Sequence, residues 1–402
     1  MLNVITVAEA QRLIARSFGM LKMPAESVHL KDAGGRALAG DALAREFVPD
    51  FDRSTVDGYA LRSKDVFGCS ESIPALMTKI GSAHMGAHTD LSLAAGECVY
   101  VPTGAEIPAG ADCVIMLEYA EVLEDGLVAV YKASPPGANL IFRGDDLRPG
   151  DAILRAGTRL SAAHIGALAA MGWTEVSVRS KPRAAVISTG DELVPAGEAL
   201  PPGKIRDVNA PMLVQAVIEA GGQADFLGII PDRIDEVRAA LKAALVEHDL
   251  VLLSGGTSVG EKDAVPQVLS ELGELLAHGL AVKPGKPTLF GSAGGKPVFG
   301  LPGNPVAAYF MFHLLARPLI ASMLGAELDE QRVSVPIARA VPSTHGREEY
   351  VAVMLRDGEA HPIPSKSGLI TTLARGDGFI AIPRDKEGLR QGELVEVTLL
   401  KR

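Results

Sequence analysis

The stretch A-A-V-I-S-T-G-D-E at residues 184–192 decides the fold class, because an apolar strand runs directly into a polar loop that bears a glycine. The stretch L-V-L-L-S-G-G-T-S-V-G at residues 250–260 repeats this pattern. Between them, the spacing of apolar residues predicts a helix over 211–220, a strand over 224–230 and a helix over 234–247. This alternation of strands and helices predicts a doubly wound α/β domain.

Both glycine-bearing loops are candidate anion sites. In a parallel sheet they lie at the carboxyl ends of the strands, where exposed N–H groups and helix N-termini attract anions. The second loop is not a Walker A loop, because Glu261 and Lys262 follow Gly260, and the G-x-G-x-x-G fingerprint is also absent from it. Glycines, hydroxyls and the carboxylate of Asp263 suit a phosphate bound with a divalent cation. The alternative is a glycine-rich turn with solvated charges.

Two further loops belong to the same predicted domain. The first, K-P-G-K-P at 283–287, is a stiff cationic loop, and the second, G-L-P-G-N-P at 300–305, leads into a long apolar helix that starts near Val306. Bracing by proline matters because a flexible lysine loses up to ~2 kcal/mol of rotamer entropy when a ligand holds it. An isolated K-P-G-K-P would be read as two solvated lysines in a turn, but here it shares a domain with two other candidate anion loops.

The composition is that of a large cytoplasmic enzyme. The chain has 402 residues, 47% of them hydrophobic, and a formal net charge of −10, which argues against a nucleic-acid-binding protein. Cys69, Cys98 and Cys113 are too few and too far apart for a disulfide framework, which favours a reducing compartment. No signal-peptide pattern opens the sequence, and the apolar run 306–324 contains His313 and charged Arg317, so we expect a buried helix and no membrane span.

The pattern of elements predicts four parts. Helical spacing over 7–18 and 161–171 flanks a region rich in β and turn signals, and the tail contains short alternating strands over 333–337, 350–355 and 394–399. We therefore expect a helical and mixed elongated domain formed by 1–43 plus 145–178, a β-rich inserted domain at 44–144, the α/β domain at 179–325 and a small C-terminal β-barrel at 326–402.

Six motifs in a fixed order carry a resemblance to a known family. They are D-G-Y-A at 57–60, T-G-A-E-I-P-A-G-A-D at 103–112, S-T-G-D-E-L at 188–193, S-G-G-T-S-V-G-E-K-D at 254–263, K-P-G-K-P and G-L-P-G-N-P. Together they resemble the molybdopterin molybdenumtransferases, the MoeA family, to which the C-terminal domain of gephyrin also belongs. The resemblance implies the same four-part fold, an α/β domain that binds molybdopterin, and an elongated homodimer.

The resemblance also implies a function in molybdenum cofactor biosynthesis. Family members insert molybdenum from molybdate into adenylylated molybdopterin, with Mg²⁺-dependent release of AMP, and a transient contact with a molybdopterin adenylyltransferase is expected. One alternative is an ATP-dependent adenylyltransferase, which the additional upstream and downstream regions disfavour. Another is a non-catalytic scaffold, which lacks the support of an appended domain or long linker. The sequence does not distinguish molybdate from tungstate.

Site residues follow from matches to the family motifs. The resemblance assigns catalytic roles to Asp57, Thr103, Glu192, Asp232 and Asp263, with Glu192 and Asp263 as the Mg²⁺ ligands. Phosphoanhydride cleavage builds charge on phosphate oxygens, which a carboxylate-held Mg²⁺ stabilises. Each carboxylate also has a structural interpretation, because Asp57-Gly58 is a common turn pair and Glu192 could cap the next segment.

The substrate-binding residues implied by the resemblance are Asp146, Ser188, Gly190, Ser254, Gly255, Gly256, Ser258, Lys283, Lys286, Pro302, Pro305, Arg347 and Ser367. Of these, Lys283, Lys286, Arg347 and Ser367 are the candidates for binding molybdate, since a tetrahedral dianion needs several converging donors. The chain departs from some family members at Gly279, where they have lysine, so a less cationic oxyanion site is expected. The far sequence position of Asp57 and Thr103 suggests a site shared across the dimer.

His84 and His88 have the four-residue spacing of a helical metal site. Gly81 and Gly86 disfavour a helix there, and no acidic residue lies between the histidines. We therefore expect a polar loop and no metal site at this pair.

Overall fold

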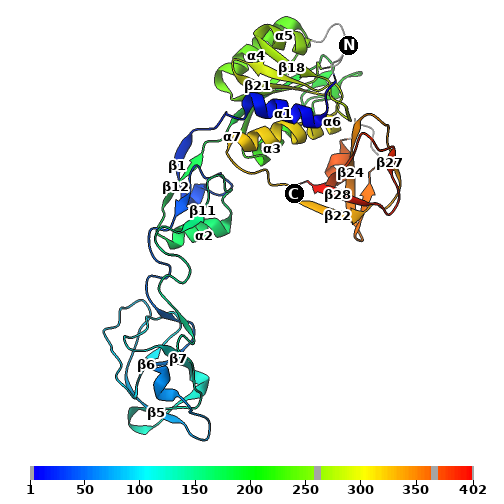
Figure 1. The fold of residues 1–402 in the computed structure, drawn as a ribbon. Helices are drawn as coiled ribbons and strands as arrows, with labels where there is room; N and C mark the ends of the chain where they lie inside the picture. The colour runs from blue at the N-terminus through cyan, green and yellow to red at the C-terminus, as the bar shows by residue number, and fades with distance from the viewer. Residues whose placement is uncertain (1–3, 258–263, 364–369, 401–402) are drawn as a thin grey trace.

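The computed structural model describes residues 4–257, 264–363 and 370–400, and these form an elongated molecule (Figure 1). At one end lies a head, which contains the α/β unit and a C-terminal β-rich unit. A stalk leads from the head to a distal β-rich unit at the other end. Helix α1 (Val7–Phe18), whose bounds match the predicted helix, lies in the head, and a capping box between Thr6 and Glu9 fixes its start.

The head is built around a six-stranded mixed sheet with the order β16-β13-β17-β21-β20-β18. Its strands are β13 (Arg183–Thr189), β16 (Gln223–Ile230), β17 (Leu250–Ser254), β18 (Gly273–His278), β20 (Leu289–Ala293) and β21 (Lys296–Leu301). The first four in the order are parallel, whereas β20 is antiparallel to both of its neighbours. Gly294 and Gly295 join β20 to β21 with φ of 58° and 76°, a turn that reverses the chain tightly and so produces the antiparallel edge.

Helices cover both faces of this sheet. Helix α3 (Asn209–Glu219) packs with α1 on the face that carries Ala184 and Val186, while α4 (Ile234–Glu247) and α5 (Ala264–Leu272) pack on the face that carries Ala185 and Ile187. Both faces of β13 are therefore buried, which explains its continuous apolar run. The predicted helix over 234–247 has the observed bounds of α4, and the predicted helix over 211–220 begins two residues earlier in the structure.

A long apolar helix follows β21. It comprises α6 (Pro305–Met311), a π-helical turn (Phe312–Ala316) and α7 (Arg317–Met323). The helix is long and apolar enough to cross a membrane, but 72% of its most apolar window is buried within the fold. It is therefore a core helix of the head.

The stalk, the distal unit and the C-terminal unit have their own cores. The stalk contains β1 (Ala25–His29), β2 (Ala42–Leu43), β11 (Ala152–Leu154), α2 (Ala162–Ala170) and β12 (Glu175–Arg179). Between the stalk and the distal unit lies a neck, which we define as residues 45–54 and 139–150 and which contains β3 (Arg53–Ser54) and β10 (Leu140–Ile141). The distal sheet has the order β7-β4-β6-β5-β9-β8, with β4 (Gly58–Leu61), β5 (Ala75–Ser82), β6 (Glu97–Val101), β7 (Cys113–Met116), β8 (Ala120–Val122) and β9 (Leu127–Val130).

The C-terminal sheet has the order β19-β24-β26-β28-β22. Its elements are β19 (Val282–Lys283), β22 (Arg332–Pro336), β24 (Glu348–Arg356), β26 (Gly378–Ile382) and β28 (Leu394–Leu399), with β25 (Glu359–Pro362) beside β24, the short pair β23 (Val341–Pro342) and β27 (Gly388–Leu389), and helix α8 (Thr371–Arg375). An isolated bridge between Ile337 and Ala360 brings the two ends of this sheet together. Strand β19 comes from the middle of the chain, so the sheet is anchored to the α/β unit.

Candidate active site

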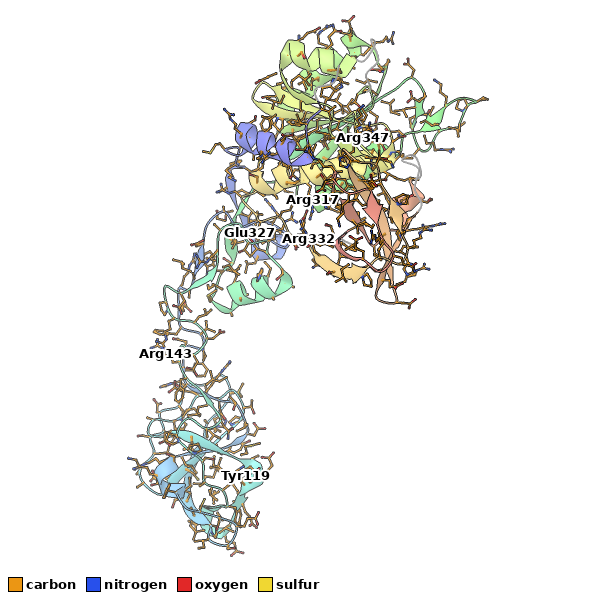
Figure 2. All side chains as sticks on the ribbon, turned by 45° about the vertical axis from the view of Figure 1, so that its right-hand side comes forward. Tyr119, Arg143, Arg317, Glu327, Arg332 and Arg347 are labelled. Carbon is orange, nitrogen blue, oxygen red and sulfur yellow. The ribbon has the colours of Figure 1, made fainter. Side chains whose placement is uncertain are left out.

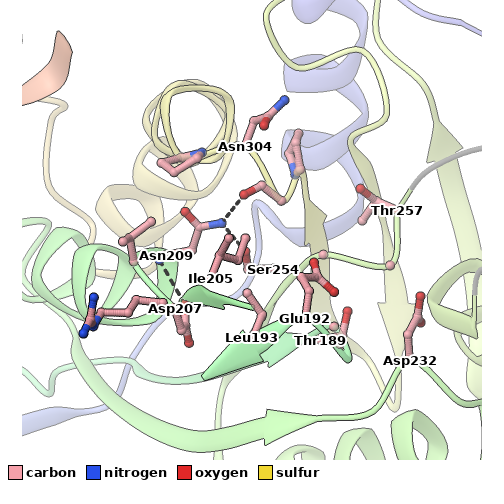
Figure 3. A pocket seen from close by; sticks show the side chains of 18 of the residues that line it. Thr189, Glu192, Leu193, Ile205, Asp207, Asn209, Asp232, Ser254, Thr257 and Asn304 are labelled. Carbon is pink, nitrogen blue, oxygen red and sulfur yellow. Dashed lines mark hydrogen bonds between the residues drawn. The ribbon is translucent and has the colours of Figure 1, made fainter. Parts of the chain in front are cut away.

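A cavity of about 890 Å³ opens at the carboxyl ends of β13 and β17 (Figure 3). The helix that follows β13 is α3, on one face of the sheet, and the helix that follows β17 is α5, on the other face. The loops after β13 and β17 therefore diverge, which is the position where open α/β sheets bind ligands. Segments 189–193, 205–209, 254–257 and 302–305 line the cavity.

Glycines allow the two loops to approach each other closely. Gly255 has φ of +97°, and a Cβ atom there would lie 2.3 Å from the backbone oxygen of Thr189. Gly256 has φ of +60°, and its Cβ would lie 3.0 Å from Oδ1 of Asp232. Because Gly256 lacks a side chain, the carboxylate of Asp232 has room beside this loop, and both Asp232 and Glu192 line the cavity.

The described carboxylates fit a magnesium ion that arrives with a phosphorylated ligand. Within residues 4–257, 264–363 and 370–400, no cluster of three or more His, Cys, Asp or Glu side chains could form a metal cage. Mg²⁺ needs only one or two protein carboxylates, since it retains waters and takes phosphate oxygens. Glu192 and Asp232 supply such carboxylates at the cavity wall. Asp263 and Ser258, which the sequence analysis also assigned here, lie outside the described residues.

Two buried polar side chains at the start of α3 were missed by the sequence analysis. Asp207 and Asn209 are only 5% and 6% exposed, and both line the cavity. Asp207 Oδ1 accepts hydrogen bonds from the N–H groups of Asn209 and Ala210, both at 3.1 Å, and Asn209 Nδ2 donates to Ser254 Oγ at 2.7 Å. The sequence signal that could have found them is the pair Asp207 and Asn209, two residues apart, just before the helix predicted over 211–220.

A second cavity of about 850 Å³ lies between the α/β unit and the C-terminal unit. Its cationic lining residues are Lys283, Lys286, Arg339 and Arg347. Figure 2 shows Arg347 where these two units meet. Strand β19 pairs with β24 so that Lys283 lies opposite Glu349, and its Nζ is 2.8 Å from Glu349 Oε1. The two cavities share Pro287, Pro302 and Asn304, so they adjoin each other.

The end of helix α6 contributes to both cavities. Asn304 lines both of them and Pro305 lines the first, immediately at the N-terminus of the helix. The partial positive charge of a helix N-terminus favours anions in this region.

Gly279, where some family members have lysine, contributes through its backbone. It has φ of +107° and its N–H donates a hydrogen bond to Thr288 O at 2.9 Å. Ser367 lies outside the described residues.

Three of the predicted site residues lie elsewhere in the chain. Thr103 follows β6 of the distal unit, where its N–H and Oγ1 donate to Asp57 Oδ1 at 2.6 and 3.0 Å. Both hydrogen bonds lower the pKa of Asp57, and the bond from the backbone N–H has the larger effect. Asp146 belongs to the neck, where its N–H donates to Val48 O at 3.1 Å. Glu192 and Asp232 therefore line one cavity of a single chain, whereas Asp57, Thr103 and Asp146 do not line it. The distal unit with β6 lies at the far end of the molecule from the head (Figure 1).

The remaining predicted residues divide between cavity and core. Gly190, Ser254, Gly255, Gly256, Pro302 and Pro305 line the first cavity. Ser188 is fully buried in β13, one residue before the cavity lining begins. His84 and His88 lie outside any helix, as expected, and His88 Nδ1 is 2.7 Å from Glu106 Oε2.

Comparisons with known proteins agree with this architecture along the whole chain. Family models match residues 5–172 (MoeA N-terminal region, domain I and II), 185–322 (probable molybdopterin binding domain) and 334–400 (MoeA C-terminal region, domain IV). A molybdopterin molybdenumtransferase of Bacillus subtilis is 34% identical over 94% of this chain and 90% of its own length. A putative molybdopterin biosynthesis protein of Methanocaldococcus jannaschii is also 34% identical, over 94% of this chain and 92% of its own.

A solved structure shows the same fold. The molybdopterin biosynthesis MoeA protein of Pyrococcus horikoshii OT3 superposes with a TM-score of 0.89 and 33% identity, covering 99% of this chain and 100% of that one. Fold and cavities thus define a multidomain α/β protein with a cavity at the switch point of its sheet. The chain belongs to the MoeA family.

Proposed function

We propose that this protein is a molybdopterin molybdenumtransferase of molybdenum cofactor biosynthesis. Its reaction inserts molybdenum from molybdate into adenylylated molybdopterin and releases AMP with the help of Mg²⁺. The observation that carries the proposal is the pair of adjoining cavities, one with glycine loops and carboxylates, the other cationic. The first suits a phosphoanhydride with a metal ion, and the second suits an oxyanion.

In the first cavity, Glu192 and Asp232 would hold Mg²⁺, together with Asp263. The ion would neutralise charge that develops on the phosphate oxygens. The loop 255–257 lets phosphate approach the backbone because glycine occupies its first two positions. Ser254, held by Asn209, fixes the start of that loop relative to α3.

In the second cavity, the cationic side chains of Lys283, Lys286 and Arg347 would bind molybdate, with Ser367 as a further donor. Glu349 orients Lys283 through its 2.8 Å ion pair. Pro302 lines both cavities and would form part of the wall between them. It would shape this wall without binding the oxyanion through its backbone, since proline has no N–H to donate. The oxyanion would thereby lie next to the dithiolene of a pterin bound in the first cavity.

We also propose that the active site is shared in a homodimer. Asp57, Thr103 and Asp146 belong to the distal unit and neck, which would lie over the α/β unit of a second copy. A mixture of inactive Asp57→Asn and Lys286→Ala chains should then recover part of the activity, because one of the two sites in a heterodimer is intact. No recovery in heterodimers isolated by two affinity tags would place the site within one chain.

The working division of the molecule remains that of the sequence analysis. We propose units at 1–43 plus 145–178, 44–144, 179–325 and 326–402, with the last as a small barrel in a cytoplasmic protein. The separate cores of the distal and C-terminal units support this division. A transient contact with a molybdopterin adenylyltransferase would deliver the adenylylated pterin.

The nearest alternative function is ATP-dependent adenylylation, and a substrate comparison separates the two. Purified protein given adenylylated molybdopterin, molybdate and Mg²⁺ should release AMP, which chromatography measures. Given molybdopterin and ATP, it should form no adenylylated product. Adenylylation without metal insertion would overturn the proposal.

A further inference from the structure

At the start of α3, two side chains that line the first cavity each carry a buried acceptor atom without a partner in the part of the chain that the structure describes. Among the described residues, neither Asp207 Oδ2 nor Asn209 Oδ1 has a hydrogen-bond partner, although both atoms are buried. A buried acceptor without a partner costs about 1–3 kcal/mol, so a native structure retains one only for a reason. Both side chains line the cavity, so a ligand there could supply the missing donors.

The surrounding contacts fix which atoms face the ligand. Asn209 Nδ2 donates to the backbone oxygen of Gly303 at 2.8 Å, and a carbonyl oxygen can only accept. The amide is therefore oriented with Oδ1 as its free acceptor. Asp207 Oδ1 is occupied by the two N–H groups at the start of α3, which leaves Oδ2 as the second acceptor.

These acceptors lie beyond Glu192 as seen from Asp232 (Figure 3). In Figure 3, Asp207 and Asn209 are separated from Asp232 and Thr257, and Glu192 and Ser254 lie between them. Apolar side chains accompany the acceptors, since Leu200 and Ile205 line the cavity while remaining 47% and 55% exposed. A flat ring could cover these side chains while its edge meets the acceptors.

We propose that Asp207 and Asn209 recognise the aminopyrimidinone edge of the pterin, so that they determine substrate specificity; this inference rests on the proposed function. That edge presents two adjacent donors, an exocyclic amine and a ring N–H. The edge of adenine presents one amine donor beside a ring nitrogen that is itself an acceptor. The second protein acceptor would repel this ring nitrogen. Two unused acceptors therefore match the pterin better than the adenine.

The position of Asn209 agrees with this assignment. Its partner Gly303 belongs to the segment 302–304, which separates the first cavity from the cationic cavity. A pterin whose edge meets Asn209 would therefore lie beside the wall of the cationic cavity, where molybdate is proposed to bind.

The test is a ligand-specificity measurement on Asp207→Asn. Asparagine at the start of α3 can still accept the helix N–H bonds, but Oδ2 becomes an amide donor. Calorimetric titrations would use three probes: 6-hydroxymethylpterin, lumazine, which has a carbonyl in place of the exocyclic amine, and AMP. The matched control is Asp235→Asn, the same change at an exposed carboxylate in the first turn of α4.

Wild type and the control should bind the pterin at least about tenfold more tightly than lumazine, because lumazine leaves an acceptor unpaired. Asp207→Asn should lose this preference or reverse it, with AMP affinity unchanged. Equal pterin and lumazine affinities in the wild type, or an unchanged preference in Asp207→Asn, would overturn the inference. So would a loss of AMP affinity in Asp207→Asn with pterin affinity intact, which would assign the adenine to this end.

The same variants separate this inference from the proposed function. If the wild type releases AMP from adenylylated molybdopterin but Asp207→Asn keeps its KM, the specificity inference fails and the function stands. If pterin preference responds as expected but no AMP is released, the binding inference stands and the proposed reaction fails.

Discussion

Replacing Gly255 with alanine tests whether close contact between the two glycine-bearing loops builds the active site. Gly255 has φ of +97°, and the new Cβ would lie 2.3 Å from Thr189 O, a backbone atom that cannot rotate away. The matched control is Gly295→Ala in the β20–β21 turn, where φ is +76° and no atom lies within 4 Å of the added Cβ.

The structure gives the size of the effect. Both variants lose about 1–2 kcal/mol of stability, because an L-residue is strained at these φ values. Gly255→Ala loses about 1–3 kcal/mol more, because an overpacked neighbour must shift. At about 2–4 °C per kcal/mol, its melting temperature should lie roughly 2–12 °C below that of the control. The displaced loop should also lower AMP release about 100-fold, since misplacement by about 1 Å can cost that much.

The assay combines thermal unfolding with AMP release from adenylylated molybdopterin at a temperature where all variants are folded. If the close contact with Thr189 builds the site, Gly295→Ala should have nearly normal turnover and Gly255→Ala should have little turnover. Equal melting temperatures and equal turnover in the two variants would refute the reasoning, since the only designed difference is the contact with Thr189.

Three other changes have expected outcomes. Glu192→Gln should abolish Mg²⁺-dependent AMP release without changing the melting temperature, whereas Glu198→Gln on the exposed neighbouring loop should be active in the same assay. Burial lowers the pKa of His313 to about 4, so the unfolded chain gains a proton on this residue at a higher pH than the folded chain does. The free energy of unfolding should therefore fall by up to about 3 kcal/mol from pH 6.5 to pH 4. Urea unfolding should measure this decrease in the wild type and not in His313→Phe. Thr103→Val should raise the pKa of Asp57 in a carboxyl NMR titration, and an unchanged pKa would disprove the role of the hydroxyl. In the wild type, the stabilisation from ionised Asp57 is present above its usual pKa of 3.8 and is lost as the pH falls through the lowered pKa.

The sequence predicted the parts of the fold that depend on periodicity. Helices α1 and α4 and strand β28 have the predicted bounds, because a repeating apolar face is visible in each. The antiparallel edge formed by β18 and β20 was not predicted, since it depends on a glycine turn and on short strands. The π-helical turn at 312–316 was also beyond prediction, because one uniformly apolar run fits both hydrogen-bond patterns.

The loops of the site were predictable, but their relationships were not. Glycines after apolar strands indicate a ligand loop from local sequence alone. The importance of Asp207 and Asn209 arises from burial and from acceptors left without partners, which only tertiary packing creates. The adjoining position of the two cavities likewise depends on β19 joining a sheet formed by the distant C-terminal residues.

The most direct test of the central claim is the coupling between AMP release and metal insertion. Wild-type protein would be incubated with adenylylated molybdopterin and Mg²⁺, with and without molybdate, and AMP and pterin-bound molybdenum would be quantified in the same samples. The proposed function predicts that molybdate triggers AMP release and that one molybdenum is inserted for each AMP. AMP release without molybdenum in the pterin, or molybdenum insertion with AMP retained, would contradict it.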